Sequence, residues 1–285
     1  MQLLQYIIQQ TQLSSKSVEN TLSLLNDDAT IPFISRYRKE LTGNLDEVQI
    51  GEILKFKELF EALEKRKSSI LKALEEQSVL TSELENQVKK SKDLISLEDL
   101  YLPFKKKRKT KAETARLQGL EPLAKMIMSQ NVNNLEQTAS KYTSKEVKTI
   151  DDALVGARFI IAEWINERTD IRNSIRRELE RFATISSKVI KNKIDEEKAQ
   201  KFKDYFDWSE GLKNIPSHRL LAILRAENEG FIRVKIDVDS DRLLQRIENR
   251  IIKSQNNCAT QIELAIQDAY KRLLFPSLSN EALSI

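Results

Sequence analysis

The sequence is poor in the residues that make tight turns. Only 6 glycines and 5 prolines occur among 285 residues. Because glycine and proline supply most turns and hairpins, their scarcity favours long helices joined by few tight turns. Residues of high helix propensity (Leu, Lys, Glu, Ala, Arg and Gln) dominate nearly every window of the chain. We therefore expect a mostly α-helical protein.

Cysteine and histidine are almost absent. The single cysteine, Cys258, excludes an internal disulfide framework, and the single histidine, His218, excludes any site that needs two imidazoles. No glycine-rich phosphate-binding loop and no cofactor-binding motif is present, so we expect no cofactor. The N-terminus lacks a secretory signal pattern, and no apolar run reaches the roughly 20 residues of a membrane span. These absences predict a cytoplasmic protein.

The charge balance is only mildly basic. The chain holds 47 basic and 43 acidic side chains, with a net charge of +4. Hydrophobic residues make up 40% and charged residues 32%, which fits a soluble globular protein. So small an excess does not predict nucleic-acid binding by itself, and the distribution of the charge matters more.

Apolar residues at helical spacing predict the first half of the chain. Residues 2–25 indicate two short helices, and a third begins at Ile31-Pro32, runs through Phe33, Ile34, Tyr37 and Leu41, and ends at Gly43. Residues 46–77 predict one long helix, which is typical of a spine between subdomains. Thr81 and Ser96 are the expected N-caps of two further helices. Residues 151–168 and 170–183 predict a helical pair, each with an acidic start.

From Thr184 the composition changes. Residues 184–190 are rich in β-branched side chains, and residues 232–238 alternate strictly between apolar and polar ones. We expect these segments to pair as a small antiparallel element, with helices at 195–206 and 217–227 between them and helix again over 242–275. The predicted domains are thus a helical one, 1–183, and a mixed helical segment with a small β element, 184–285.

A basic segment interrupts the helical pattern. It carries six cations within seven residues and no acid: Lys105, Lys106, Lys107, Arg108, Lys109 and Lys111. Such a cluster repels itself unless an anionic partner is present, and it is suited to neutralising phosphates without reading sequence. The alternative is a solvated surface loop. Both interpretations stay open on the sequence alone.

The residues after the basic segment predict a helix-turn-helix-like unit over about 97–130. Thr110-Lys-Ala-Glu113 has the pattern of a capping box, Ala115 is small enough for close packing, and Gly119 suits the turn. The second helix would span Glu121–Gln130, but its first turn offers Glu121, Pro and Leu rather than residues that read base edges. We expect backbone contact, with Arg116 beside the basic segment, and no base readout.

Two other candidate sites are weaker. Asp237, Asp239 and Asp241, with Glu248, resemble a calcium loop, but Arg242 stands where that loop needs glycine. The alternative is a strand end followed by a helix that Asp241 caps. The same carboxylates, on one strand, are a poor two-metal nuclease centre. We expect no metal site, and we expect His218 to bond the backbone rather than act in acid–base chemistry.

Several stretches together resemble the Tex family of bacterial transcription accessory proteins. They are Ile31-Pro-Phe-Ile-Ser-Arg-Tyr-Arg-Lys-Glu40 with Thr42-Gly43, Leu97-Glu-Asp-Leu-Tyr-Leu-Pro-Phe-Lys105, Arg108-Lys-Thr-Lys-Ala112, Gly119-Leu-Glu-Pro-Leu123, Lys201-Phe-Lys-Asp-Tyr-Phe206, Ile215-Pro-Ser-His-Arg219 and Asn228-Glu-Gly230. Their order matches the family over nearly the whole chain.

The resemblance implies a helical N-terminal region with a helix-turn-helix-like unit. In the family an RNase H-like domain, a helix-hairpin-helix segment and an OB-fold (S1) RNA-binding domain follow. None is present before the sequence ends soon after Ser277, so we expect a fragment of a longer protein. Family members are thought to bind nucleic acid without marked sequence preference and to act around transcription.

The expected function is that of a non-catalytic transcription accessory fragment. It would bind the backbone of RNA or DNA without sequence specificity, through Lys105–Lys111 and Arg116. Its expected partners are RNA or DNA and, on the protein side, RNA polymerase or other transcription machinery, with no membrane partner. The alternative is a protein-interaction scaffold that docks transcription machinery and binds no nucleic acid itself. An enzyme is not expected.

Overall fold

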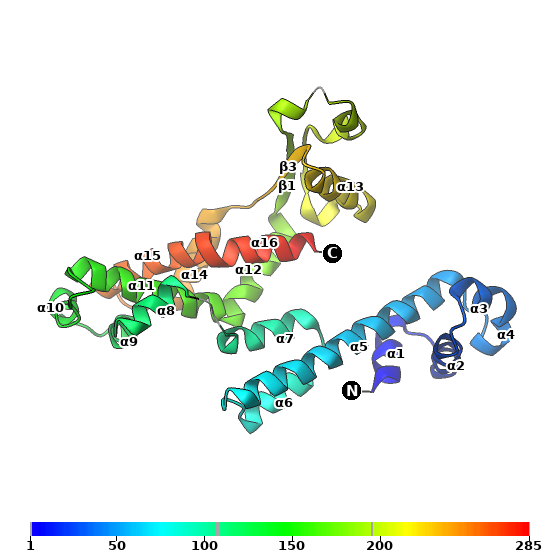
Figure 1. The fold of residues 1–285 in the computed structure, drawn as a ribbon, viewed down its shortest axis with the longest axis horizontal. Helices are drawn as coiled ribbons and strands as arrows, with labels where there is room; N and C mark the ends of the chain where they lie inside the picture. Colours follow the sequence, from blue (N-terminus) through cyan, green and yellow to red (C-terminus); the bar gives the residue numbers. More distant parts are fainter. Residues whose placement is uncertain (1, 107–108, 195, 285) are drawn as a thin grey trace. The chain divides into compact units, whose positions relative to one another are not determined.

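The chain divides into two compact units, residues 1–105 and 106–285. The computed structural model describes residues 2–106, 109–194 and 196–284 (Figure 1). Both units are mostly helical, and the second also carries a small antiparallel sheet. The predicted fold class, mostly α with a small β element, is confirmed. The change in composition at Thr184 falls within the second unit, where the first strand begins.

The first unit is built from helices on a long central one. They are α1 (Leu3–Thr11), α2 (Ser15–Asn26), α3 (Ile31–Tyr37), α4 (Lys39–Thr42), α5 (Glu47–Glu76), α6 (Ser82–Lys90) and α7 (Leu94–Tyr101). Ile50 and Ile53 of α5 are buried in one apolar core with α1–α3, whereas Ile70 and Leu74 are buried in another with α6 and α7. The long helix predicted over 46–77 is therefore confirmed. It carries two separate cores along its length.

Two predictions in the first unit need correction. The helix expected over 31–43 is broken at Arg38, whose φ of −130° lies outside the helical range and separates α3 from α4. Ser96 does not cap α7. The cap is Asp93, whose Oδ1 accepts a hydrogen bond from the Ser96 N–H at 2.7 Å. A carboxylate at the N-cap, next to the free N–H groups of the first turn, also complements the positive end of the helix dipole.

The second unit has a helical part and a sheet lobe. Its helices are α8 (Lys111–Leu117), α9 (Glu121–Ser129), α10 (Leu135–Ser140), α11 (Ile150–Glu167), α12 (Thr169–Phe182), α13 (Ser217–Asn228), α14 (Ser240–Ile251), α15 (Asn257–Ala269) and α16 (Phe275–Leu283), and its strands are β1 (Thr184–Val189), β2 (Asp207–Gly211) and β3 (Ile232–Asp237). The helical pair predicted after residue 150 corresponds to α11 and α12.

Helix α11 lies at the centre of the helical part. Ile160, Ile161 and Ile165 are buried among residues of α8, α9, α12 and α15. Small residues let these neighbours approach closely, and Gly156 is one such point. A Cβ added there would lie 2.2 Å from Cδ1 of Leu120, a residue that is itself fully buried. The second unit therefore depends on a glycine inside a helix, where glycine is otherwise unfavourable.

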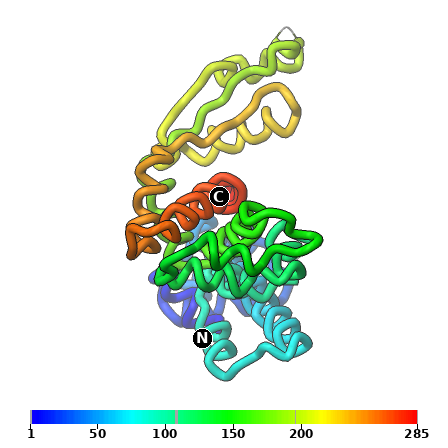
Figure 2. The backbone as a smooth tube through the Cα atoms, turned by 90° about the vertical axis from the view of Figure 1, so that its left-hand side faces the viewer, coloured from blue at the N-terminus to red at the C-terminus, as the bar shows by residue number. Residues whose placement is uncertain are grey.

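The sheet lobe is antiparallel in the order β2-β1-β3. The predicted pairing of β1 and β3 is confirmed, with Ile185 opposite Ile236. Strand β2 was not predicted, and residues 197–205, expected as an α-helix, form a 3₁₀ helix instead. Figure 2 shows β1, β3 and α13 as a lobe that extends from the helical part of this unit. A small core of its own, including Phe202, Ile223 and Phe231, holds the lobe together.

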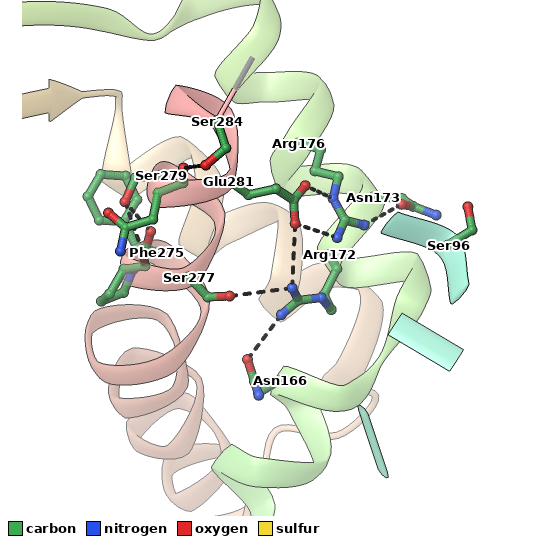
Figure 3. Close-up of polar contacts among 12 residues, drawn as sticks. Ser96, Asn166, Arg172, Asn173, Arg176, Phe275, Ser277, Ser279, Glu281 and Ser284 are labelled. Carbon is green, nitrogen blue, oxygen red and sulfur yellow. Dashed lines mark hydrogen bonds and ion pairs between the residues drawn. The ribbon is translucent and has the colours of Figure 1, made fainter. Parts of the chain in front are cut away.

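Helix α16 is attached to α12 through charged side chains. Arg176 of α12 makes a bidentate contact with Glu281 of α16, at 2.5 Å and 2.9 Å, and an Nη of Arg172 lies 3.8 Å from the same carboxylate (Figure 3). The Arg172 guanidinium also donates to Asn166 Oδ1 and to Ser277 Oγ. Bidentate pairs of this kind fix geometry as well as adding stability.

The helix predicted over 242–275 is interrupted between α14 and α15. Gln130, which ends α9 with a φ of +59°, reaches into this break. Its Nε2 donates to the Ile251 carbonyl at 2.9 Å, and its Oε1 accepts from the Lys253 N–H at 2.6 Å. The buried amide thus satisfies backbone groups that the break leaves without helical partners. Beyond α15 the chain makes a π-helical turn over Tyr270–Leu274 before α16.

Among the described residues, no helix is both long enough and apolar enough to cross a membrane.

The close approach at Gly156 makes a prediction about stability. Gly156→Ala is expected to lower the free energy of unfolding by about 1–3 kcal/mol, because the added methyl group overpacks a buried contact. Gly51→Ala is the matched control: it also lies within a helix, but a Cβ there meets no atom within 4 Å. It should raise stability by about 0.5–1 kcal/mol. Urea denaturation measures both. Equal or greater stability of Gly156→Ala would contradict the packing described.

Candidate nucleic-acid interface

The basic segment joins the two structural units along the chain. Lys105, Lys106 and Lys109 have exposed side chains, as does Lys111, the first residue of α8. Lys107 and Arg108 lie outside the described residues. Within the described part of the chain, none of the four exposed lysines is ion-paired with a carboxylate. Their ammonium groups are therefore accessible to an external anion.

Lys111 has a defined position on the second unit. Its Nζ lies 4.8 Å from the centroid of the Phe159 ring on α11. The Arg272 guanidinium of the π-helical turn lies 5.5 Å from the same ring. A cation over an aromatic face is attracted by the ring quadrupole while it keeps its charge. The start of α8 therefore presents a cation that forms no ion pair with a carboxylate of the described residues.

Thr110 fixes where α8 begins. Its Oγ1 accepts a hydrogen bond from the Glu113 N–H at 3.0 Å, as the predicted N-cap requires. The reciprocal half of the predicted capping box is not formed, because the Glu113 carboxylate lies 3.5 Å from Arg116 instead. The Thr110 hydroxyl also lies 3.5 Å from Oε2 of Glu163 on α11. The end of the basic segment is thus attached to the central helix of its unit.

Arg116 lies within a group of carboxylates. Its guanidinium is 2.6 Å from Glu163 and 3.5 Å from both Glu113 and Glu121. Burial alone would lower the pKa of Arg116, but the hydrogen bond to Glu163 and the charges of Glu163, Glu121 and Glu113 raise it. An incoming phosphate would have to compete with these acids. Arg116 therefore fixes α8 on α11, and the sequence pattern gave no sign of its partner Glu163.

Helices α8 and α9 form the pair predicted from sequence. Gly119, with a φ of +78°, makes the turn between them, and Ala115 is buried, as expected. Leu123, Ala124 and Ile127 of α9 face the core. Among the outward side chains of α9 the cation is Lys125, which is 3.0 Å from Glu121. This face offers little chemistry for reading base edges.

The acidic residues at the end of β3 have local structural roles. Asp237 bonds with Lys235 and lies 3.4 Å from Ser186 Oγ. Asp239, not Asp241 as predicted, caps α14: its Oδ1 accepts from the Arg242 N–H at 3.0 Å. Across residues 2–106, 109–194 and 196–284, no three His, Cys, Asp or Glu side chains gather as a metal site would require.

With the backbone of the described residues, His218 does not make the predicted hydrogen bond. Its side chain is exposed in the first turn of α13.

A second cationic surface was missed by the sequence reasoning. Phe33 and Tyr37 of α3 were taken as part of a helical pattern and of a family motif, and not as a binding surface, yet both rings are exposed, and Tyr37 is 67% exposed. Arg36, Arg38 and Lys39 surround them. The available signal was the alternation of aromatic and basic residues in this short stretch.

Comparison with known proteins identifies family regions in both units. Residues 1–75 match the Tex-like protein N-terminal domain. Residues 130–282 match the Tex central region-like domain.

Full-length relatives are similar along nearly the whole chain. The chain is 39% identical over 281 residues to the uncharacterized protein YdcI of Bacillus subtilis (strain 168), covering 97% of this chain and 39% of that protein. It is 34% identical over 290 residues to the Transcriptional accessory protein Tex of Neisseria gonorrhoeae, covering 100% of this chain and 38% of that protein. It is 30% identical over 295 residues to S1 RNA-binding domain-containing protein 1 of Homo sapiens, covering 98% of this chain and 29% of that protein. The chain thus spans about two fifths or less of these relatives.

The contacts of Arg116 make a prediction about the attachment of α8. Arg116→Ala is expected to lower the free energy of unfolding by about 1–3 kcal/mol, because it leaves the nearly buried Glu163 carboxylate with fewer charged partners. Lys125→Ala is the matched control, since Lys125 pairs with the same Glu121 but is 67% exposed. It should change stability by less than about 0.5 kcal/mol. Thermal unfolding distinguishes them, and equal effects of the two variants would refute the assigned role of Arg116.

Proposed function

This chain belongs to the Tex family, and on that premise we propose that it is a non-catalytic part of a transcription accessory protein. It binds the backbone of RNA or DNA through the basic segment, without sequence specificity. The observation that carries the proposal is the exposure of Lys105, Lys106, Lys109 and Lys111 without carboxylate partners in the described residues. The names of two relatives support it, one a transcriptional accessory protein and one an S1 RNA-binding domain-containing protein. The proposed compartment is the cytoplasm.

Charge neutralisation supports phosphates as the ligand. Cations crowded into seven residues repel one another, and a polyphosphate backbone relieves this repulsion while releasing its condensed counterions. Some other basic side chains of the second unit are paired with acids. Arg176 is paired with Glu281, and Arg246 lies 2.6 Å from Glu178. The lysines of the basic segment differ from these two arginines in that they have no carboxylate partner in the described residues, and they lie close together in the sequence.

Backbone contact, rather than base readout, agrees with the helix pair that follows. A recognition helix needs several outward side chains that can bond base edges. Helix α9 offers Lys125, which is paired with Glu121, together with Pro122 and Ser129. We propose that the α8–α9 pair is a helix-turn-helix-like unit that positions the segment and reads no bases. In this arrangement Arg116 supports α8, and the lysines contact phosphate.

The alternative function is a protein-interaction scaffold that docks RNA polymerase or other transcription machinery. It would be favoured if acidic helices covered the basic segment. Helix α11 does approach Lys111, with the Phe159 ring 4.8 Å from the Lys111 Nζ. Asp152 of α11 lines the same hollow as Lys111, but the two side chains form no ion pair in the described residues. We therefore rank nucleic-acid binding first, with transcription machinery as an additional class of partner.

Salt-dependent binding tests the proposal. Lys105→Ala/Lys106→Ala/Lys109→Ala is expected to weaken binding of single-stranded RNA and duplex DNA about tenfold or more at low salt. The slope of log K against log salt should fall by about 2–3, because three phosphate contacts are lost. Fluorescence anisotropy at several salt concentrations measures both quantities for oligonucleotides of unrelated sequence.

The matched control removes the same charge elsewhere. Lys55, Lys65 and Lys72 are exposed on α5, and their replacement by Ala should leave the slope nearly unchanged. Wild-type affinity in the basic-segment variant would refute the proposal and favour the scaffold. A preference above about tenfold for one sequence would contradict non-specific binding.

The proposal assigns no catalytic step to this chain. The carboxylates that could be imagined as a nuclease centre are engaged locally: Asp237 with Lys235, and Asp239 with the backbone of α14. We expect no cleavage of RNA or DNA in the presence of Mg²⁺ or Mn²⁺, assayed on denaturing gels. Cleavage that is lost in Asp237→Asn would contradict this expectation.

A further inference from the structure

The first unit has an exposed surface that combines aromatic and basic side chains. We call it the basic–aromatic patch and define it as Phe33, Arg36, Tyr37, Arg38 and Lys39. It lies on α3 and at the start of α4, beside the N-terminal part of α5 (Figure 1). The Tyr37 residue is 67% exposed and the Arg36 side chain 69% exposed. Exposed aromatic rings grouped with cations are uncommon on a surface that serves only to face water.

The planar groups of the patch are held in place before any ligand arrives. The Phe33 and Tyr37 rings, one helical turn apart, have their centroids 5.5 Å from each other. The Arg38 guanidinium lies 5.0 Å from the Phe33 centroid, and its Nη1 donates to the Tyr37 carbonyl at 3.0 Å. Phe33 and Arg38 thus restrict each other, and the Phe33 ring in turn contacts Tyr37, so the Tyr37 ring loses less conformational entropy when a base stacks on it.

The backbone beneath the patch is also anchored. Ile34 is fully buried in the core that α3 shares with α5. The Asn20 side chain of α2 donates to the Leu41 carbonyl at 2.6 Å. Gly43, with a φ of +70°, ends α4 against α2, where a Cβ would lie 2.7 Å from Ser17 Oγ. The patch therefore lies on a rigid support.

The charge of the patch is positive. Arg36, Arg38 and Lys39 contribute three cations around a shallow hollow that Glu40 also lines. The ion pair found here joins Arg36 to Glu47 at 4.0 Å, the outer limit of such a contact, between two side chains that are mostly exposed. Exposed pairs of this geometry are weak and are easily exchanged for another anion.

We propose that the basic–aromatic patch binds single-stranded nucleic acid by stacking a base on Tyr37 while the flanking phosphates contact Arg36 and Lys39. The proposal rests on the proposed function and adds a second site to it. Aromatic and guanidinium planes are the surfaces on which unpaired bases stack, and stacking tolerates any base. A duplex cannot use this site, because its bases already stack on one another. An acidic peptide would match the charge of the patch, but its carboxylates would not stack on the aromatic and guanidinium planes.

The test compares a 12-nucleotide oligo(dA) with an abasic 12-mer that carries the same phosphates. The wild-type chain should bind the base-bearing strand about five- to tenfold more tightly or better, as expected for stacking of one base. Tyr37→Ala should remove this preference and leave affinity for the abasic strand unchanged. Tyr37→Phe, which keeps the ring, should retain the preference. Anisotropy titrations give the six affinities of the three proteins for the two strands, and circular dichroism verifies that each variant is folded.

The outcomes separate this inference from the proposed function. Equal wild-type affinities for the two strands, or a preference that survives Tyr37→Ala, would refute base stacking at the basic–aromatic patch. Neither result would affect the proposal that the basic segment binds phosphates. The Lys105→Ala/Lys106→Ala/Lys109→Ala variant should weaken both strands by the same factor and preserve the preference. If that variant binds both strands like wild type while Tyr37→Ala removes the preference, binding through the basic segment is refuted and base stacking at the patch is supported. If the wild-type chain binds neither strand, both the proposed function and the stacking site are refuted.

Discussion

The burial of α11 is the constraint on which the second unit depends. A helix surrounded by α8, α9, α12 and α15 must present small residues where its neighbours cross it, and Gly156 is one of these residues. The same helix carries a carboxylate, Glu163, whose side chain is only 9% exposed. A nearly buried carboxylate needs a charged partner, and Arg116 of α8 supplies it. Packing and charge pairing therefore attach α8 to α11 together.

This attachment determines what the basic segment can do. Thr110 and Arg116 hold the start of α8 against α11, and Lys111 lies over the Phe159 ring. The cations at the end of the segment consequently lie on a rigid support. Two acids of this region, Glu113 and Glu121, are engaged by Arg116, and the lysines have no carboxylate partners in the described residues. The arrangement suits a partner recognised by charge rather than by shape.

Local patterns predicted most of the fold, and long-range contacts account for what they missed. Apolar residues at helical spacing were sufficient for α1, α2 and α5, and strict alternation was sufficient for β3. Strand β2, with the sequence Asp-Trp-Ser-Glu-Gly, has no such alternation and is held by its pairing with β1. The caps were misassigned because Asp93 and Asp239 each stand within three residues of another plausible cap, and only the backbone geometry selects between them.

The candidate sites also combine features that the sequence shows directly with features that depend on long-range packing. A run of lysines is visible in any sequence, whereas the role of Arg116 depends on Glu163, which is 47 positions away and reaches it only through the packing of two helices. Exposure of Phe33 and Tyr37 depends on which face of α3 packs on α5, and the burial of Ile34 decides this. A run of charged residues can therefore be predicted from sequence. Which of those charges form ion pairs in the folded chain, and which stay accessible to a ligand, cannot.

Lysine footprinting tests the central claim most directly, because it reports on each ammonium group. The whole chain would be acetylated briefly with and without a single-stranded oligonucleotide, and each site quantified by mass spectrometry. Binding through the basic segment predicts strong protection of Lys105, Lys106, Lys109 and Lys111, with little change at Lys55, Lys65 and Lys72. Protection confined to other lysines, or unchanged reactivity across the basic segment under binding conditions, would contradict the account.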